Sequence, residues 1–172
     1  SRSFYMKEKP IKSPQDLVGK KIRVQKSNMA VAMVNNLGGS PTPISWGELY
    51  TALQQGVVDG QDNPYITVHA MKFNEVQKYV TNLRYIFSLE PLIVSETVFQ
   101  QQTPEMQKII LEAGQEATEH SFAYLENTEN KIREELQAKG MVFTDPADNE
   151  QEWISKVTKS VWPKFYSSIG GK

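Results

Sequence analysis

Short stretches in which apolar and polar residues alternate are followed by segments with helical periodicity along the first half of the chain. Residues 21–25 alternate in this way and place Arg23 opposite two aliphatic neighbours, as expected of a short strand. Segments 28–37 and 45–55 instead repeat apolar residues every three or four positions. This succession of strands and helices predicts an α/β fold with a mainly parallel sheet, whose ligand crevice lies at the carboxyl ends of the strands.

The first of the two helices has capping residues at both ends. Ser27 is a candidate N-cap, and Gly38 suits the left-handed conformation that closes many helices. Three apolar residues recur at helical spacing between them, and their type and spacing predict burial in the core: Met29, Met33 and Leu37. We therefore expect a helix from residue 28 to about residue 37.

The second helix is expected to begin with a capping box. Ser45 and Glu48 have the required spacing, so the helix should extend from this pair to Gln55. Glu48 is explained by this role and needs no catalytic one. Trp46 falls in the first turn of the helix, near the strand ends, and the sequence alone favours packing against a neighbouring helix.

A much longer helical pattern begins at Thr103 and ends before Gly140. At 1.5 Å per residue an unbroken helix of this length would span about 55 Å. A compact domain of this chain length is only roughly 40 Å across. The helix therefore either kinks, with Gly114 as the candidate position, or braces more than one lobe.

Strand-forming residues come before the long helix and a shorter helix follows it. The clusters Tyr85-Ile86-Phe87 and Leu92-Ile93-Val94 are rich in β formers and predict strands. A further short strand is expected at 141–144. The last helix should run over 149–166 and turn four apolar residues toward a core: Trp153, Val157, Val161 and Phe165.

Two residues near the strand ends suit the binding of an anion. A guanidinium held on a strand, as at Arg23, is aimed in advance and grips a carboxylate through two parallel N–H···O bonds. Asn63 carries both a donor and an acceptor, and Pro64 restricts its backbone to extended conformations. The alternative from the residues alone is that Arg23 is an exposed strand residue and Asn63 a turn former.

Composition narrows the function classes. The 172 residues include 19 Lys and Arg against 20 Asp and Glu, a formal net charge of −1 that argues against a nucleic-acid-binding protein. No cysteine is present, which is compatible with an oxidising compartment as well as with the cytosol. No Gly-x-Ser-x-Gly elbow, His-Glu-x-x-His motif or phosphate-binding glycine loop occurs, so no enzymatic constellation or cofactor site is predicted.

The chain resembles the solute-binding proteins of TRAP (tripartite ATP-independent periplasmic) transporters, the DctP-like family, over most of its length before the long helix and more weakly after it. The matching blocks follow the family's order and approximate spacing. They are Pro10-Ile11, SPQDLVG at 13–19, KIRV at 21–24, Gly38, SPTP at 40–43, ELYTALQQGVVDGQ at 48–61, Asn63-Pro64, EVQKY at 75–79 and LIVS at 92–95.

The resemblance implies roles for particular residues. Arg23 is in the place of the family's arginine that grips the ligand carboxylate, and Asn63 in that of a ligand-binding asparagine. Arg2 lies near a second ligand arginine after a one-residue gap, and Trp46 falls where an aromatic residue often lines the pocket. The chain departs from the common pattern by having Asp62 where glutamate is usual.

The resemblance also implies an architecture. Residues 1–90 would form a periplasmic-binding-protein-like ligand-binding lobe. Residues 91–172 would supply a crossover strand and hinge, a long helix that spans two lobes, and a C-terminal helical region. The chain would then be a C-terminal portion of such a protein, without a signal peptide and with its N-terminal lobe largely absent. Apolar surface left exposed in this way would favour self-association.

The function implied is that of a periplasmic solute-binding protein that needs no cofactor. It would capture a small organic acid, such as a C4-dicarboxylate, sugar acid or keto acid, and deliver it to a TRAP membrane permease. One alternative is an α/β enzyme in which Arg23 clamps a carboxylated substrate and Asp59 or Asp62 is the base. Another is an assembly protein in which the long helix is the functional element.

Overall fold

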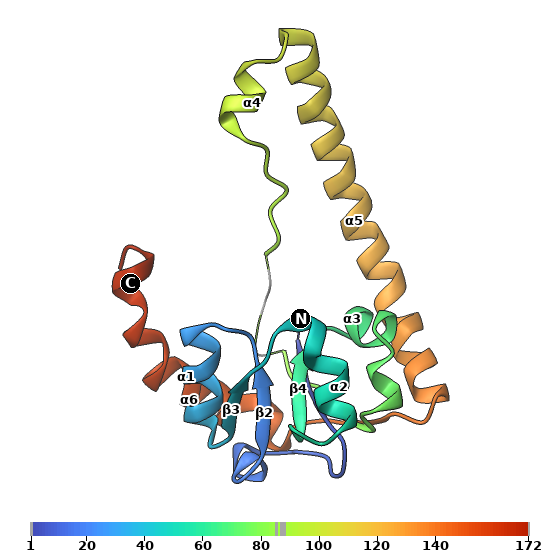
Figure 1. Ribbon diagram of the computed structural model, residues 1–172, viewed down its shortest axis with the longest axis vertical. Coiled ribbons are helices and arrows are strands. Elements are labelled where there is room, and N and C mark those ends of the chain that lie inside the picture. Colours follow the sequence, from blue (N-terminus) through green and yellow to red (C-terminus); the bar gives the residue numbers. More distant parts are fainter. Residues whose placement is uncertain (1, 85, 87–88, 172) are drawn as a thin grey trace.

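A sheet with the strand order β3-β2-β4-β1-β5-β6 forms the centre of this computed structural model, which describes residues 2–84, 86 and 89–171 (Figure 1). Five strands run in one direction, and β1 runs antiparallel to both of its neighbours, β4 and β5. The predicted mainly parallel α/β sheet is confirmed, with β1 as its exception. The strands are β1 (Ser3–Met6), β2 (Lys21–Val24), β3 (Ser40–Pro43), β4 (Gly60–Asn63), β5 (Tyr79–Thr81) and β6 (Val142–Thr144).

Helices cover both faces of the sheet. Helices α1 (Asn28–Leu37) and α6 (Gln151–Ser160) pack on one face, and α2 (Leu49–Gln54), α3 (Tyr65–Ala70) and the last turns of α5 (Pro104–Ala138) pack on the other. Neighbouring residues of a strand point to opposite faces, so β1 places Phe4 and Met6 in one core and Tyr5 in the other. Short 3-10 turns lie at Pro14–Leu17, Trp46–Glu48, Phe73–Glu75, Ala147–Glu150, Trp162–Lys164 and Tyr166–Ile169.

Helix α1 has the predicted bounds and caps. The Ser27 side chain accepts a hydrogen bond from the backbone N–H of Ala30, and Gly38 adopts a φ of 98° at the other end. Met33 and Leu37 are buried as predicted. The prediction for Met29 is wrong: this residue lies in the first turn of the helix and is 42% exposed.

Two other helix boundaries differ from prediction. The hydroxyl of Ser45 donates a hydrogen bond to the Glu48 carboxylate at 2.5 Å, and its oxygen caps no backbone N–H. A 3-10 turn takes the place of the first helical turn, and α2 begins at Leu49. At the other end of the chain α6 stops at Ser160 instead of continuing to residue 166. Pro163 explains this stop, since proline lacks the N–H that an α-helix needs and its ring clashes with the preceding turn.

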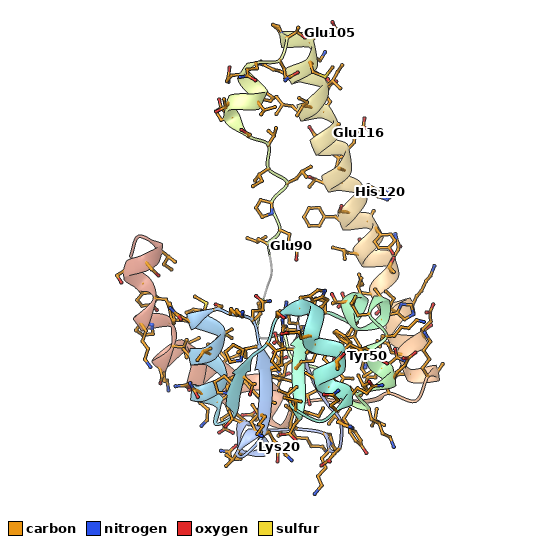
Figure 2. All side chains as sticks on the ribbon, in the orientation of Figure 1. Lys20, Tyr50, Glu90, Glu105, Glu116 and His120 are labelled. Atoms are coloured by element: carbon orange, nitrogen blue, oxygen red, sulfur yellow. The ribbon has the colours of Figure 1, made fainter. Side chains whose placement is uncertain are left out.

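Residues 89–125, which we call the arm, extend away from the sheet as an ascending segment, the short helix α4 (Glu96–Gln100) and most of α5 (Figure 1). Figure 2 shows Glu105, Glu116 and His120 on this arm, well away from the sheet. Helix α5 continues through Gly114 as a single element, so the alternative of a kink at this glycine is not observed. No described helix is both long and apolar enough to cross a membrane.

The strand predicted at residues 92–94 does not form in the described part of the chain. Leu92, Ile93 and Val94 have no regular secondary structure and are exposed, and no described strand pairs with them. Their side chains suit a strand, but a strand also needs a partner for its backbone groups. Of the other predicted strand, Tyr85 and Phe87 lie outside the described residues.

Candidate binding site at the carboxyl edge of the sheet

The site residues predicted from the sequence lie at the side of the sheet where its parallel strands have their carboxyl ends, which we call the carboxyl edge. Strands β2, β3 and β4 are parallel, so their carboxyl ends meet at this edge. Strand β1 runs the other way and begins here, with Ser3 opposite Asn63. The antiparallel direction of β1 therefore brings Arg2 to the edge that already holds Arg23 and Asn63.

Arg2 is bound to the end of β4 by three hydrogen bonds. Its Nε donates to Oδ2 of Asp62 at 2.6 Å, and its Nη2 donates to the Asp62 carbonyl oxygen at 2.7 Å. The same Nη2 donates to Oδ1 of Asn63 at 3.2 Å. The Arg2 and Asp62 side chains carry opposite charges, so their hydrogen bond is charge-assisted and stronger than one between neutral groups. Both side chains are also mostly buried.

Arg23 is buried without a bonded carboxylate. It is 4% exposed, and its Nε donates to the carbonyl oxygen of Ile44 at 3.0 Å. None of the ion pairs among the described residues includes it. Burial lowers the pKa of its guanidinium; Asp62 opposes this shift, and the positive charge of Arg2 adds to it. An arginine nevertheless stays charged in proteins, so an unsatisfied cation remains at this edge.

Trp46 lies next to this cation. The Arg23 Cζ atom is 5.8 Å from the centroid of the Trp46 ring, within the range of a cation–π contact. The ring also contacts buried Phe73 in an edge-to-face arrangement, with 5.8 Å between ring centroids. Trp46 is still 44% exposed, so part of the ring remains free to cover an apolar surface beside a bound anion.

The structure thus brings the four predicted residues together as two linked pairs, Arg2 with Asn63 and Arg23 with Trp46. The sequence interpretation missed Asp62 as the partner of Arg2. It also missed buried Gln61 and Gln77, which lie behind Asn63. The strand period offered a signal for Gln61, because residues two apart on a strand share a face. Gln77 had no such signal, since it lies outside the strands.

The geometry does not favour the enzyme alternative. The carboxylate of Asp62 is occupied by Arg2. Asp59 lies at the opposite edge of the sheet, where its Oδ2 accepts a hydrogen bond from the backbone N–H of Lys21 at 2.7 Å. Neither carboxylate is placed as a free base beside Arg23. The described residues also contain no cluster of His, Cys, Asp or Glu suited to holding a metal ion.

A separate cleft of about 570 Å³ opens where β5 and β6 end. It carries both signs of charge and several amides, and none of the four predicted site residues lines it. Some of its polar groups bond to one another: Asn82 donates to Asp145 at 3.0 Å and accepts from the hydroxyl of Tyr65. Its lining residues are Tyr65, Asn82, Arg84, Glu129, Asn130, Arg133, Asp145, Pro146, Asn149 and Glu150.

Comparison with known proteins agrees with the resemblance. A family model described as bacterial extracellular solute-binding protein, family 7 (DctP) matches residues 1–169. A solute-binding protein of Roseobacter denitrificans is 36% identical over 138 residues, which are 80% of this chain and 42% of that protein. The C4-dicarboxylate-binding periplasmic protein DctP of Vibrio cholerae is 32% identical over 167 residues, covering 94% of this chain and 49% of that protein.

Solved structures confirm the fold. A TRAP periplasmic solute-binding protein from a Sulfitobacter species, with bound β-D-galacturonate, matches 98% of this chain and 55% of its own with a TM-score of 0.90 and 30% identity. A TRAP solute-binding protein from Pseudomonas putida F1, with bound D-glucuronate, gives a TM-score of 0.89 at 32% identity over 99% of this chain and 54% of its own. The chain spans about half the length of the curated relatives it matches. The matching family and the similar structures are solute-binding proteins of transport systems, not enzymes.

Proposed function

Because the chain belongs to family 7 of the bacterial extracellular solute-binding proteins, we propose that its protein captures a small organic acid outside the cytoplasmic membrane and delivers it to a TRAP-type permease. The acid would be a C4-dicarboxylate, a sugar acid or a keto acid. Similar proteins bind C4-dicarboxylate, galacturonate and glucuronate; the first is an open-chain diacid and the other two are sugar acids, and all three carry a carboxylate. The carboxylate is therefore the group that the site should recognise first.

Arg23 is the observation that carries this proposal. Its guanidinium is buried at the carboxyl edge of the sheet and no described carboxylate is bonded to it. A buried charge is strongly unfavourable unless an opposite charge and hydrogen bonds satisfy it. A ligand carboxylate supplies both, through two parallel N–H···O bonds to the guanidinium fork.

Three further residues would complete the site. Arg2 brings a second positive charge, and Asp62 balances only one of the two arginines, so the cluster keeps a net positive charge. Asn63 lies beside Arg2 and would donate to the ligand from its amide. Trp46 would cover the less polar side of the ligand with the exposed part of its ring.

The arm suggests where a second lobe packs. We assign residues 1–90 to the ligand-binding lobe, and we infer that the arm, most of which falls in residues 91–172, packs against a second lobe. Its exposed apolar side chains support this division, since large apolar surfaces left in contact with solvent mark interaction sites. These residues are Leu92, Ile93, Val94, Val98, Met106, Ile109, Leu111, Phe122, Tyr124 and Leu125. Self-association would be the alternative way to cover them.

A thermal-shift screen on the complete gene product that carries this chain tests the proposal. The panel contains D-glucuronate, D-galacturonate and succinate, each paired with a neutral analogue: D-glucose, D-galactose and succinamide. A ligand present at 100 times its Kd stabilises the native state by about 2.7 kcal/mol, a readily measured rise in Tm. We expect at least one acid to raise the Tm and its neutral analogue to leave it unchanged. A folded protein that no acid stabilises, or that acid and analogue stabilise equally, would contradict the proposal.

A further inference from the structure

Three buried amide side chains form a continuous hydrogen-bonded row that ends at the proposed site. Gln77 donates from Nε2 to the carbonyl oxygen of Tyr5 at 2.9 Å. Gln61 donates from Nε2 to Oε1 of Gln77 at 2.9 Å, and Asn63 donates from Nδ2 to Oε1 of Gln61 at 2.5 Å. Arg2 then donates to Oδ1 of Asn63. We call Gln77, Gln61 and Asn63 the amide row; all three are buried.

The two ends of the amide row fix its direction. The carbonyl oxygen of Tyr5 only accepts hydrogen bonds, so Gln77 must turn its NH₂ group toward it and its oxygen toward Gln61. The guanidinium of Arg2 only donates, so Asn63 must turn its oxygen toward Arg2. Reversing any single amide would place two oxygens or two NH₂ groups face to face in a buried site, which is strongly unfavourable.

Strand geometry explains why the row exists. Gln61 and Asn63 are two residues apart on β4 and therefore share a face of the sheet. Strand β1 lies next to β4, with Tyr5 opposite Gln61, and β5 follows on its other side. Gln77, just before β5, reaches the carbonyl of Tyr5 from there. The row thus connects the strand next to the site with a segment two strands away.

We propose that Gln61 and Gln77 are positioning residues that hold the amide of Asn63 with its oxygen toward Arg2 and its nitrogen available to a ligand. This inference rests on the proposed function. One hydrogen of Asn63 Nδ2 bonds to Gln61, and no hydrogen bond among the described residues uses the other. A carboxylate oxygen can accept from that second hydrogen. A reversed amide would instead bring its NH₂ group against the cation of Arg2.

The substitution Gln77→Leu removes the fixed end of the row without touching the site. Gln61 then loses its acceptor and no longer holds the nitrogen of Asn63 firmly, so the bond from Arg2 is the contact that remains to orient the Asn63 amide. We expect Kd for D-glucuronate or succinate to rise roughly tenfold, about the effect of one hydrogen bond to a charged group. Gln77→Met, which keeps more of the side-chain volume and shape, serves as the second variant in case the leucine variant does not fold.

A double-mutant cycle separates positioning from simple destabilisation. Gln77→Leu should weaken binding in the wild-type background and have no further effect in an Asn63→Ala background, because its action passes through Asn63. Val34→Ala is the matched control, since it removes buried volume in the opposite core and should lower stability without changing Kd. An equal effect of Gln77→Leu in both backgrounds, or none in either, would overturn the proposal.

A ligand-free measurement distinguishes failure of this inference from failure of the proposed function. The two side-chain NH₂ protons of Asn63 give separate ¹H–¹⁵N NMR signals because rotation about the amide C–N bond is slow, and in the wild-type protein the proton bonded to Gln61 should be shifted downfield and exchange slowly with water. Gln77→Leu should shift and broaden these signals, and Val34→Ala should leave them in place. Unchanged Asn63 signals in the folded Gln77→Leu protein would overturn the positioning role. Absence of acid binding in the wild-type protein would instead contradict the proposed function.

Discussion

The carboxyl edge of the sheet buries polar side chains, whereas the arm exposes apolar ones. At the edge, polar and charged residues are buried, including Arg23, Gln61 and Asn63. Along the arm, large apolar residues are exposed, with Ile93 and Phe122 as clear examples. Each region therefore lacks something that the described chain does not supply: the edge lacks an anion for Arg23, and the arm lacks an apolar surface to cover it.

This contrast shows how an unsatisfied group points to the chemistry of its partner. A buried cation calls for a small anion that fits between fixed donors. A broad apolar face calls for another folded surface, because burial of apolar area is what drives such association. The first feature supports ligand binding, and the second supports packing against another lobe.

The largest expected effect on stability comes from comparing the same substitution at the two ends of α5. Leu136 is fully buried in the last turns of α5, whereas Leu111 on the arm is 63% exposed. Leu136→Ala should lower the free energy of unfolding by about 2–5 kcal/mol, and Leu111→Ala should change it by less than about 0.5 kcal/mol. Urea denaturation of this chain measures both. Equal losses for the two variants would mean that the arm is packed within the chain itself.

A smaller effect is expected from removing carboxylates. Asp62→Ala leaves the mostly buried Arg2 without its partner and should cost about 1–3 kcal/mol of stability. The matched change on the arm is Glu112→Ala, which breaks an exposed pair with Lys108 at 3.7 Å and should cost less than about 0.5 kcal/mol. Chemical denaturation in low and high salt checks both values. Losses of the same size would remove the distinction between a buried and an exposed pair.

The smallest effect should depend on pH. The Oδ2 atom of Asp16 accepts hydrogen bonds from the backbone N–H groups of Lys12 and Ser13, at 2.8 and 2.9 Å. The bond from Lys12 is the largest influence that lowers the pKa of Asp16 in the folded protein. A lowered folded-state pKa stabilises the protein fully above the unfolded-state value of 3.8, and this stabilisation is lost as pH falls through the folded-state pKa.

Asp16→Asn should therefore lower stability by about 0.5 kcal/mol at neutral pH, a small value because the side chain is exposed. Urea titrations of both proteins across the acid range measure the difference. The two stabilities should converge at low pH, where the wild-type aspartate is protonated. A difference that stays constant down to the lowest accessible pH would contradict this assignment.

Local patterns were sufficient to predict the alternation of strands and helices that builds the sheet, and most of the helices themselves. The caps Ser27 and Gly38 and the residues at 21–24 act within a few positions of one another, so a linear pattern contains the necessary information. The strand predicted at 92–94 is wrong because β propensity reflects packing against a neighbouring strand, and the sequence does not say whether one is present.

The site was only partly predictable for a related reason. Arg23 and Asn63 follow from their places near strand ends, and resemblance to the family added Arg2 and Trp46. The pairing of Arg2 with Asp62 depends on the antiparallel register of β1, and residues 3–6 are all buried and show no alternation that would reveal it. The contact of Gln77 with the Tyr5 carbonyl joins residues 72 positions apart, beyond any local pattern.

The central claim is that the buried guanidinium of Arg23 binds a ligand carboxylate. The most direct test is the Kd of the tightest acid from the panel, measured by calorimetry for the wild-type gene product and Arg23→Gln, with Lys21→Gln as a control that removes a positive charge from the same strand at its exposed end. Arg23→Gln should weaken binding by about 2–5 kcal/mol, while its ligand-free stability should stay equal or rise, because an unpaired buried charge is gone. A folded Arg23→Gln protein that keeps near-wild-type affinity, or that loses no more than Lys21→Gln, would contradict the claim.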